Sequence, residues 1–284
     1  MIEQSSKVSV YISTHNRLDR LKRALNSVVN QDYNNIEILV CDDASSDGTY
    51  DYMTERATKD PRIIYLRNEN NKGACATRNL GIFYATGKFI TGLDDDDEFT
   101  SDRISNFLNS WDDRYSFICC NFINRYPNIN DKAYYATHNK ALIFDHKKIL
   151  FENEASNQIF TLTSRLKDIG GFDVSVRRLQ DWDTWLRLSF TFGNFVRLPH
   201  VTYIMNHDHL PTENRVSREY KITDALLELV HRNHFIYSKK EKEYMFFLVS
   251  TMQKNADFKS SIYWSIKNMN VKFFIKYLLQ YTHQ

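Results

Sequence analysis

Five consecutive carboxylates at residues 94–98 restrict the fold of this chain more than any other feature. They follow directly on a short apolar run at 89–93, which has the length and composition of a buried strand. Neighbouring carboxylates repel one another unless a cation or solvent compensates their charge. The sequence therefore predicts a buried strand that ends abruptly at an edge of the fold where cations or water can reach it.

Metal binding is one interpretation of this acidic strand end. Side chains at positions i and i+2 of an extended chain point the same way, so we expect Asp94 and Asp96 to face one side, with Asp95 and Asp97 facing the other. Two carboxylates on one side form a hard oxygen site suited to Mg²⁺ or Mn²⁺. A solvated acidic turn is the plainer alternative. The metal site is favoured because open α/β sheets bind ligands beyond the carboxyl ends of their strands.

Short apolar segments alternate with amphipathic ones before these carboxylates. We expect strands at 8–12, 36–41 and 63–66, and helices at 49–58 and 74–85. This alternation predicts an α/β fold with a mostly parallel sheet flanked by helices. Polar or acidic clusters follow three strands, at 14–17, 42–43 and 94–97. We expect them to meet at the carboxyl edge of the sheet.

The middle of the chain holds a candidate general base. Asp181 opens a predicted helix, so an N-cap is the simple structural explanation for it. Trp182 and Trp185 would lower the local dielectric and raise the pKa of Asp181 towards a useful value, although core packing explains them equally well. Farther along, we expect a hairpin that joins strands at 196–198 and 201–205.

Residues 217–284 are helical in pattern. Lysines beside aromatic residues, such as Lys267 and Lys272 near Trp264 and Phe273, are typical of helices that lie in a membrane interface. A packed helical lobe with solvated lysines fits the same pattern equally well. Contact with an inner membrane through these helices is therefore left open. No apolar stretch is long enough to span a bilayer, and the polar N-terminus does not resemble a signal peptide.

Composition excludes some classes of protein. The 37 Lys and Arg residues nearly balance 35 Asp and Glu residues, so no nucleic-acid partner is expected. The 4 cysteines lack metal-ligand spacing, and a reducing, cytoplasmic setting is the simpler account of them. There is no P-loop motif and no nucleophile-elbow motif.

Four segments, in this order, resemble the family 2 glycosyltransferases of the GT-A fold. The first is VSVYISTHNR at 8–17, and the second is LVCDDASSDGT at 39–49, with Ala44 where glycine is usual. The third runs from residue 70 to 99 and ends in the aspartates. The fourth is GGFDVSVRRLQDWDTWLRL at 170–188, with Gln180 where the family often has glutamate. The resemblance implies a Rossmann-like GT-A domain with a helical C-terminal extension.

The same resemblance implies a role for each matched residue. On the donor side, Thr14, Arg17, Arg78, Asp94 and Asp95 would line the site of the nucleotide-sugar, and either Asp42 or Asp43 would contact uracil. Asp94 and Asp96 would form the Asp-x-Asp metal motif, with Asp96 as the direct ligand. Asp181 would deprotonate the acceptor hydroxyl. His207 or His209 would approach the metal or the diphosphate.

We therefore expect an inverting, hexosyl- or N-acetylhexosaminyl-transferring enzyme that uses a UDP-sugar and Mn²⁺ or Mg²⁺. Its acceptor would be a glycan hydroxyl, on a lipid carrier, in O-antigen, lipopolysaccharide or capsule biosynthesis. Residues 1–100 would bind the nucleotide-sugar, 101–216 the acceptor, and 217–284 would form the helical region. A sugar-phosphate nucleotidylyltransferase and an inactive carbohydrate-binding subunit are the alternatives, and homo-oligomerisation is left open.

Overall fold

The computed structural model describes residues 5–135, 140–156, 158–208 and 220–279. The chain divides into two compact units, residues 1–176 with 180–213 and residues 177–179 with 214–284. The first unit is an α/β domain and the second is helical, as the sequence predicts. The division of the first unit into donor and acceptor halves at residue 100 stays a prediction.

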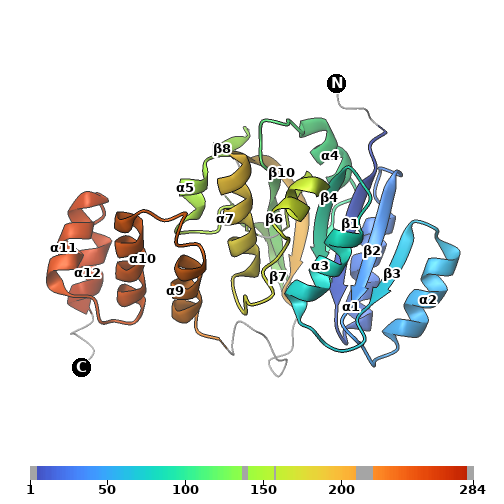
Figure 1. Cartoon of the computed structure of the whole chain (residues 1–284), viewed down its shortest axis with the longest axis horizontal. Helices are drawn as coiled ribbons and strands as arrows, with labels where there is room; N and C mark the ends of the chain where they lie inside the picture. Colours follow the sequence, from blue (N-terminus) through green and yellow to red (C-terminus); the bar gives the residue numbers. More distant parts are fainter. Residues whose placement is uncertain (1–4, 136–139, 157, 209–219, 280–284) are drawn as a thin grey trace. The chain divides into compact units, whose positions relative to one another are not determined.

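A ten-stranded sheet forms the centre of the first unit (Figure 1). Its strands are β1 (Val8–Thr14), β2 (Ile36–Asp42), β3 (Ile63–Arg67), β4 (Phe89–Asp94), β5 (Glu98–Phe99), β6 (Ile118–Tyr126), β7 (Ile129–Ala133), β8 (Leu142–Phe144), β9 (Phe160–Leu162) and β10 (Phe195–Asn206). The order along the sheet is β3-β2-β1-β4-β9-β6-β10-β5, with β7 beside β6 and β8 beside β10. Strands β3, β2, β1 and β4 are parallel, so their carboxyl ends share one edge.

Helices flank this sheet. They are α1 (Leu18–Val29), α2 (Thr49–Lys59), α3 (Ala74–Tyr84), α4 (Arg103–Ser110), α5 (His146–Ile149), α6 (Thr163–Asp168) and α7 (Gln180–Phe192). The buried stripe of α1 joins the core with Val10 and Ile12 of β1. Helix α3 covers the opposite face, where a Cβ on Gly81 would lie 2.8 Å from both Tyr11 Cβ and Cys41 Sγ. Glycine at that position lets α3 approach the sheet closely.

Strand β10 corrects the predicted hairpin. It is one strand from Phe195 to Asn206 and runs parallel to β6 along its length. Its register shifts between Leu198 and Val201, around Pro199. Proline has no backbone N–H to donate to a ladder, so a bulge is the arrangement that keeps it inside a paired strand. The same proline led to the wrong prediction of a turn, and the short strand β7 was missed.

The second unit contains four helices among its described residues: α9 (Ile222–Arg232), α10 (Lys239–Met252), α11 (Phe258–Lys267) and α12 (Lys272–Leu279). Ser238 and Glu241 form a reciprocal capping box that begins α10. Phe247 of α10, Trp264 of α11 and Phe273 of α12 make a small core with Ala256. Within the ranges that the structure describes, no helix is both long and apolar enough to cross a bilayer.

A buried carboxylate fixes the amino edge of the parallel strands. Glu37 of β2 accepts hydrogen bonds from Ser9 Oγ (2.5 Å), Thr86 N (2.6 Å) and Gly87 N (3.0 Å), and pairs with Lys7 Nζ (2.6 Å). Burial alone would raise the pKa of Glu37, but these donors outweigh it and lower the pKa to about 2. This carboxylate therefore ties β1, β2 and the turn before β4 together, at the end of the strands away from the polar clusters.

The substitution Glu37→Gln tests this role. It should lower the free energy of unfolding at pH 7 by about 3 kcal/mol, because the ionised carboxylate is stabilised in the folded state relative to the unfolded chain. A depressed folded pKa contributes stability that is present above pH ~4.5 and is lost as the pH falls towards about 2. Urea denaturation of both proteins at several pH values should show the difference shrinking across that window.

Glu55→Gln is the matched control. Glu55 lies on α2, is exposed, and pairs with the exposed Lys59 on the same helix, so its loss should change stability little. Equal effects of the two substitutions, or a Glu37→Gln effect that does not depend on pH, would contradict the structural role of Glu37.

Candidate active site

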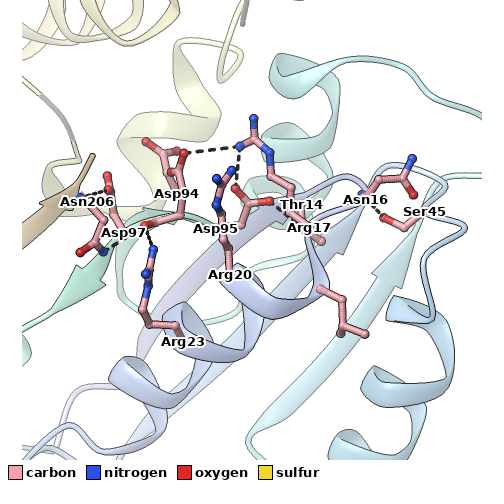
Figure 2. A network of polar contacts seen from close by, with 12 residues as sticks. Thr14, Asn16, Arg17, Arg20, Arg23, Ser45, Asp94, Asp95, Asp97 and Asn206 are labelled. Atoms are coloured by element: carbon pink, nitrogen blue, oxygen red, sulfur yellow. Dashed lines mark hydrogen bonds and ion pairs between the residues drawn. The ribbon is translucent and has the colours of Figure 1, made fainter. Parts of the chain in front are cut away.

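Side chains from β1 and the start of α1 hold the acidic turn that follows β4 (Figure 2). Thr14 ends β1 and donates to Asp95 Oδ2 over 2.8 Å. Arg17 precedes α1, and its Nη1 lies 3.0 Å from Asp95 Oδ1 and 3.5 Å from Asp96 Oδ2. The structure thus brings three predicted donor-side residues, Thr14, Arg17 and Asp95, together with Asp96 of the predicted metal motif.

The acidic run turns instead of continuing as an extended strand. Strand β4 ends at Asp94, and the Asp97 N–H donates back to the Asp94 carbonyl over 3.1 Å. Asp95 and Asp97 are buried, whereas the side chains of Asp94 and Asp96 are 26% and 16% exposed. Burial first, and repulsion from Asp96 second, raise the pKa of Asp95 to about 6. The two residues of the predicted Asp-x-Asp pair are therefore the ones that a ligand can reach.

The buried member Asp97 is held by residues that sequence analysis missed. Tyr203 OH donates to its Oδ2 over 2.8 Å, and Asn206 N donates to its Oδ1 over 2.9 Å. Asn206 Nδ2 also donates to the carbonyl of Asp96 (3.0 Å), so the end of β10 is fastened to the turn. Figure 2 shows this contact between Asn206 and Asp97 beside Arg23, which donates to the same Asp96 carbonyl over 2.7 Å.

The donor set fits a hard divalent cation. Asp94 and Asp96 supply two partly exposed carboxylates. Burial first, and repulsion from neighbouring aspartates second, raise the pKa of Asp95 and Asp97, so a cation at this turn would be favoured. Among the residues that the structure describes, no group of three or more His, Cys, Asp or Glu is arranged to hold an ion. Mg²⁺ is typically bound by one or two carboxylates, and water and phosphate oxygens complete its coordination shell. These residues therefore suit a cation that is shared with a phosphate ligand.

Two adjacent carboxylates close β2 next to this turn. Asp42 is fully buried and accepts from Ser45 N (2.9 Å) and Tyr65 OH (2.5 Å). Asp43 accepts from Asn68 Nδ2, Lys72 N and Gly73 N, each at 2.8 Å. Burial would raise the pKa of Asp43, but these donors lower it. Asp43 thus anchors the loop that leads into α3, and both carboxylates stay candidates for a nucleobase contact.

Backbone strain accompanies these residues. Asn16 (φ 52°), Ala44 (φ 59°) and Leu179 (φ 66°) adopt the left-handed conformation directly beside Arg17, Asp43 and Gln180. Non-glycine residues rarely adopt it, and such strain is concentrated at functional sites. Ala44 is the position where the resemblance leads one to expect glycine, and its positive φ gives the physical reason for that preference.

Arg78 of α3 connects the acidic turn to the start of α7. Its Nη2 donates to Asp94 Oδ1 (2.9 Å), its Nη1 donates to Gln180 Oε1 (2.7 Å), and Nη1 lies 3.7 Å from Asp181 Oδ1. Burial would lower the pKa of Arg78, but the carboxylates of Asp94 and Asp181 raise it well above its ordinary value. The guanidinium is therefore a fixed positive charge between the predicted metal motif and the predicted base.

Asp181 has the properties of a general base. Its Oδ1 is buried and accepts no hydrogen bond from the residues that the structure describes, although Arg78 lies 3.7 Å away, and its side chain is 25% exposed. Burial raises its pKa to about 6, with a smaller lowering by Arg78 and a further rise from Asp94. Arg187 of α7 pairs with the buried Asp183 on the same helix over 2.9 Å and donates to the carbonyls of Ile169 and Gly171 (2.8 Å each), which fastens α7 to the preceding turn. A carboxylate with a pKa near neutrality can accept a proton from a bound hydroxyl.

Gln158 is a further residue that sequence patterns did not reveal. It is buried, accepts from Tyr11 OH (2.9 Å) and donates to Asp94 Oδ1 (3.3 Å). A Cβ at Gly92 would lie only 2.3 Å from Gln158 Oε1, so glycine in β4 makes room for this amide. Gln158 therefore helps Arg78 to orient Asp94, because both donate to the same oxygen, Oδ1.

The predicted histidines are not both described. His207 stacks on Tyr126 at 4.3 Å between ring centroids, and its Nε2 lies 2.7 Å from Asn124 Oδ1, so its ring is engaged with the end of β6. His209 lies outside the described residues. A contact of either residue with a metal or diphosphate stays a prediction.

The fold is similar to that of solved glycosyltransferases. S. aureus TarS (residues 1–349, in complex with UDP-GlcNAc) matches with a TM-score of 0.67 and 17% identity, covering 88% of this chain and 72% of TarS. The mannosyltransferase PcManGT from Pyrobaculum calidifontis, in complex with GDP-Man and Mn²⁺, matches with a TM-score of 0.56 and 15% identity, covering 96% and 83%. At these identities the likeness establishes the GT-A fold.

The sequence is similar to those of named glycosyltransferases. The first is WcaA of Escherichia coli K12, named as a colanic acid biosynthesis glycosyl transferase, which is 32% identical over 83% of this chain and 82% of its own length. The second is a Campylobacter jejuni GalNAc(5)-diNAcBac-PP-undecaprenol β-1,3-glucosyltransferase, 39% identical over 39% of this chain and 37% of its own length. The family model described as glycosyl transferase family 2 matches residues 9–207. The chain therefore belongs to glycosyl transferase family 2 and is a glycosyltransferase.

Proposed function

We propose that this glycosyltransferase moves a hexosyl or N-acetylhexosaminyl group from a UDP-sugar to a hydroxyl of a lipid-linked glycan, with inversion at the anomeric carbon. The observation that carries the proposal is the position of Arg78 between Asp94 and Asp181. One guanidinium links the acidic turn, where a diphosphate and its cation fit, to a carboxylate that can act as base. The family assignment excludes the nucleotidylyltransferase alternative, and the intact Asp94, Asp96 and Asp181 argue against an inactive subunit.

The donor is assigned from the carboxyl edge of β1, β2 and β4. Thr14 and Arg17 lie beside the acidic turn, and Asp42 and Asp43 close the neighbouring strand. A carboxylate can accept the imide N–H of uracil, which supports a uridine nucleotide. TarS binds UDP-GlcNAc, and another relative, WfaP of Escherichia coli, is named for transfer from UDP-Glc. PcManGT binds GDP-Man, so the donor screen must include GDP-sugars.

The chain's own residues would stabilise the leaving diphosphate. Negative charge grows on the leaving group in the transition state, and preorganised cations lower the energy of that charge. Arg17 and Arg78 are positioned to do this, because each is already held by carboxylates of the turn. Mn²⁺ or Mg²⁺ on Asp94 and Asp96 would supply further Lewis-acid stabilisation when bound.

Asp181 would activate the acceptor. A sugar hydroxyl has a pKa far above neutrality, so a base must accept its proton as the new bond forms. Asp181 offers a buried oxygen with no hydrogen-bond donor, and Gln180 beside it is neutral, so only one carboxylate is available at this step. A single base and no nucleophile between it and the donor give single displacement, which inverts the anomeric configuration.

The acceptor is assigned from relatives. The Campylobacter enzyme and WfaP are both named for undecaprenyl-diphosphate-linked glycans, but this chain spans well under half the length of each. A lipid-linked acceptor of surface-polysaccharide biosynthesis would place the enzyme at the cytoplasmic face of a membrane. Four buried, unpaired cysteines are consistent with a reducing compartment.

The variant Asp181→Asn tests the proposed base. Asparagine keeps the shape but cannot accept the proton, so transfer should fall by at least about 100-fold, while UDP binding changes little. Sugar transfer to acceptor and calorimetric titration of UDP would measure the two effects. Asp168→Asn, an exposed aspartate on α6, is the matched control and should behave as the parent protein. Near-parental transfer by Asp181→Asn would make Asp181 a structural residue.

The pH dependence of the reaction tests the environment of the same group. Burial raises the pKa of Asp181 to about 6, and only its deprotonated form acts as base. The kcat/KM of the free enzyme should therefore fall as the pH drops below about 6, approaching tenfold per pH unit, and should level off above it. A profile that stays flat from pH 5 to pH 7, with UDP binding intact over that range, would remove Asp181 from this role.

A further inference from the structure

The helical unit presents apolar side chains to solvent on one side of a two-helix layer. Trp264 of α11 and Phe273 of α12 both pack on Phe247 of α10. Two residues along a helix correspond to a rotation of about 200°, so Ile266 and Ile275 point away from α10. Six residues on this side and on the connecting turn form what we call the apolar face. They are Ile266, Met269, Val271, Ile275, Leu278 and Leu279, and all are exposed.

The turn between α11 and α12 contains the most exposed side chain of the apolar face. Met269 is 96% exposed and Val271 is 63% exposed. Met269 also adopts a left-handed conformation (φ 49°) just after the end of α11, where glycine or asparagine is usual. A large apolar residue in a strained position, with no packing in return, indicates a role outside the folded unit itself.

Positive charge surrounds the apolar face. From residue 253 to residue 279 the chain has five lysines and one acidic residue, Asp257. This stretch is therefore +4, while the whole chain is +2, so the remainder is net negative. Lys267 and Lys272 flank the exposed turn, and Lys276 directly follows Ile275 in α12. The Nζ of Lys267 lies over the Trp264 ring, 4.4 Å from its centroid, in a cation–π contact.

We propose that this surface, the apolar face with Lys267, Lys272 and Lys276, docks on an anionic lipid bilayer. Apolar side chains that enter the interface, with lysines at the level of the phosphates, are the combination that peripheral helices use. A second copy of the chain is the poorer occupant, because a symmetric contact would place lysines against lysines. The proposal rests on these residues alone and does not depend on the identity of the donor or acceptor.

Vesicle co-sedimentation of the full chain tests the proposal. The protein should bind vesicles of phosphatidylcholine mixed with phosphatidylglycerol, bind pure phosphatidylcholine far more weakly, and dissociate as salt is raised. The triple variant Lys267→Gln, Lys272→Gln, Lys276→Gln should bind the anionic vesicles about 100-fold more weakly. Met269→Asp with Val271→Asp should also lose binding, although it leaves the lysines in place.

Two controls make the result specific to this surface. Lys59→Gln, Lys147→Gln, Lys148→Gln removes the same charge from exposed lysines of the α/β unit and should bind as the parent protein does. Circular dichroism and transfer to a soluble acceptor analogue should be unchanged in all variants, since every substituted side chain is at the surface. Absence of binding by the parent protein, equal weakening by the control, or parental binding by the Met269 and Val271 variant would overturn the proposal. A parental dimer that these substitutions dissociate, without lipid binding, would instead assign the surface to a second copy.

Discussion

Charge compensation at the end of β4 is the interaction on which the catalytic half of this protein depends. Four aspartates follow a buried strand, and two of them, Asp95 and Asp97, are themselves buried. Arginines from α1 and α3 and polar groups from β1 and β10 surround the turn. A buried carboxylate without such partners would be strongly destabilising, so the turn can exist only where these elements meet. The folding of the sheet edge and the formation of the site are therefore one event.

The same compensation is incomplete at two carboxylates. The pKa of Asp95 and of Asp181 is raised to about 6, although Arg17 and Arg78 lie beside them. Carboxylates with perturbed pKa values are concentrated at functional sites. At the opposite edge of the sheet, Glu37 is fully satisfied and its pKa is lowered to about 2. The two edges of one sheet thus hold buried carboxylates with opposite pKa shifts. We infer that Glu37 contributes stability and that the acidic turn contributes reactivity.

The sequence predicted the parts of this structure that local patterns determine. Apolar runs located β1 to β4, and the alternation with helices gave the parallel sheet and the shared edge. The roles of Gln158, Tyr203 and Asn206 could not be predicted, because each meets the acidic turn across 64 or more residues of intervening chain. The predicted hairpin in place of β10 was wrong because Pro199 is typical of a turn, and pairing with β6 keeps the chain extended through it.

The sequence pattern of the helical tail fits both a packed lobe and a membrane-binding surface. The structure contains a packed core, and it also leaves an apolar face exposed.

We propose that the acidic turn after β4 binds a cation together with the diphosphate of the donor. Anomalous diffraction at the manganese edge, from crystals grown with UDP and Mn²⁺, tests it most directly. We expect a single strong peak at about 2.0–2.5 Å from a carboxylate oxygen of Asp96 or Asp94, with the diphosphate at the same turn and uracil near Asp42 and Asp43. Ordered UDP elsewhere on the protein, or UDP at this edge with no manganese on either aspartate, would contradict it.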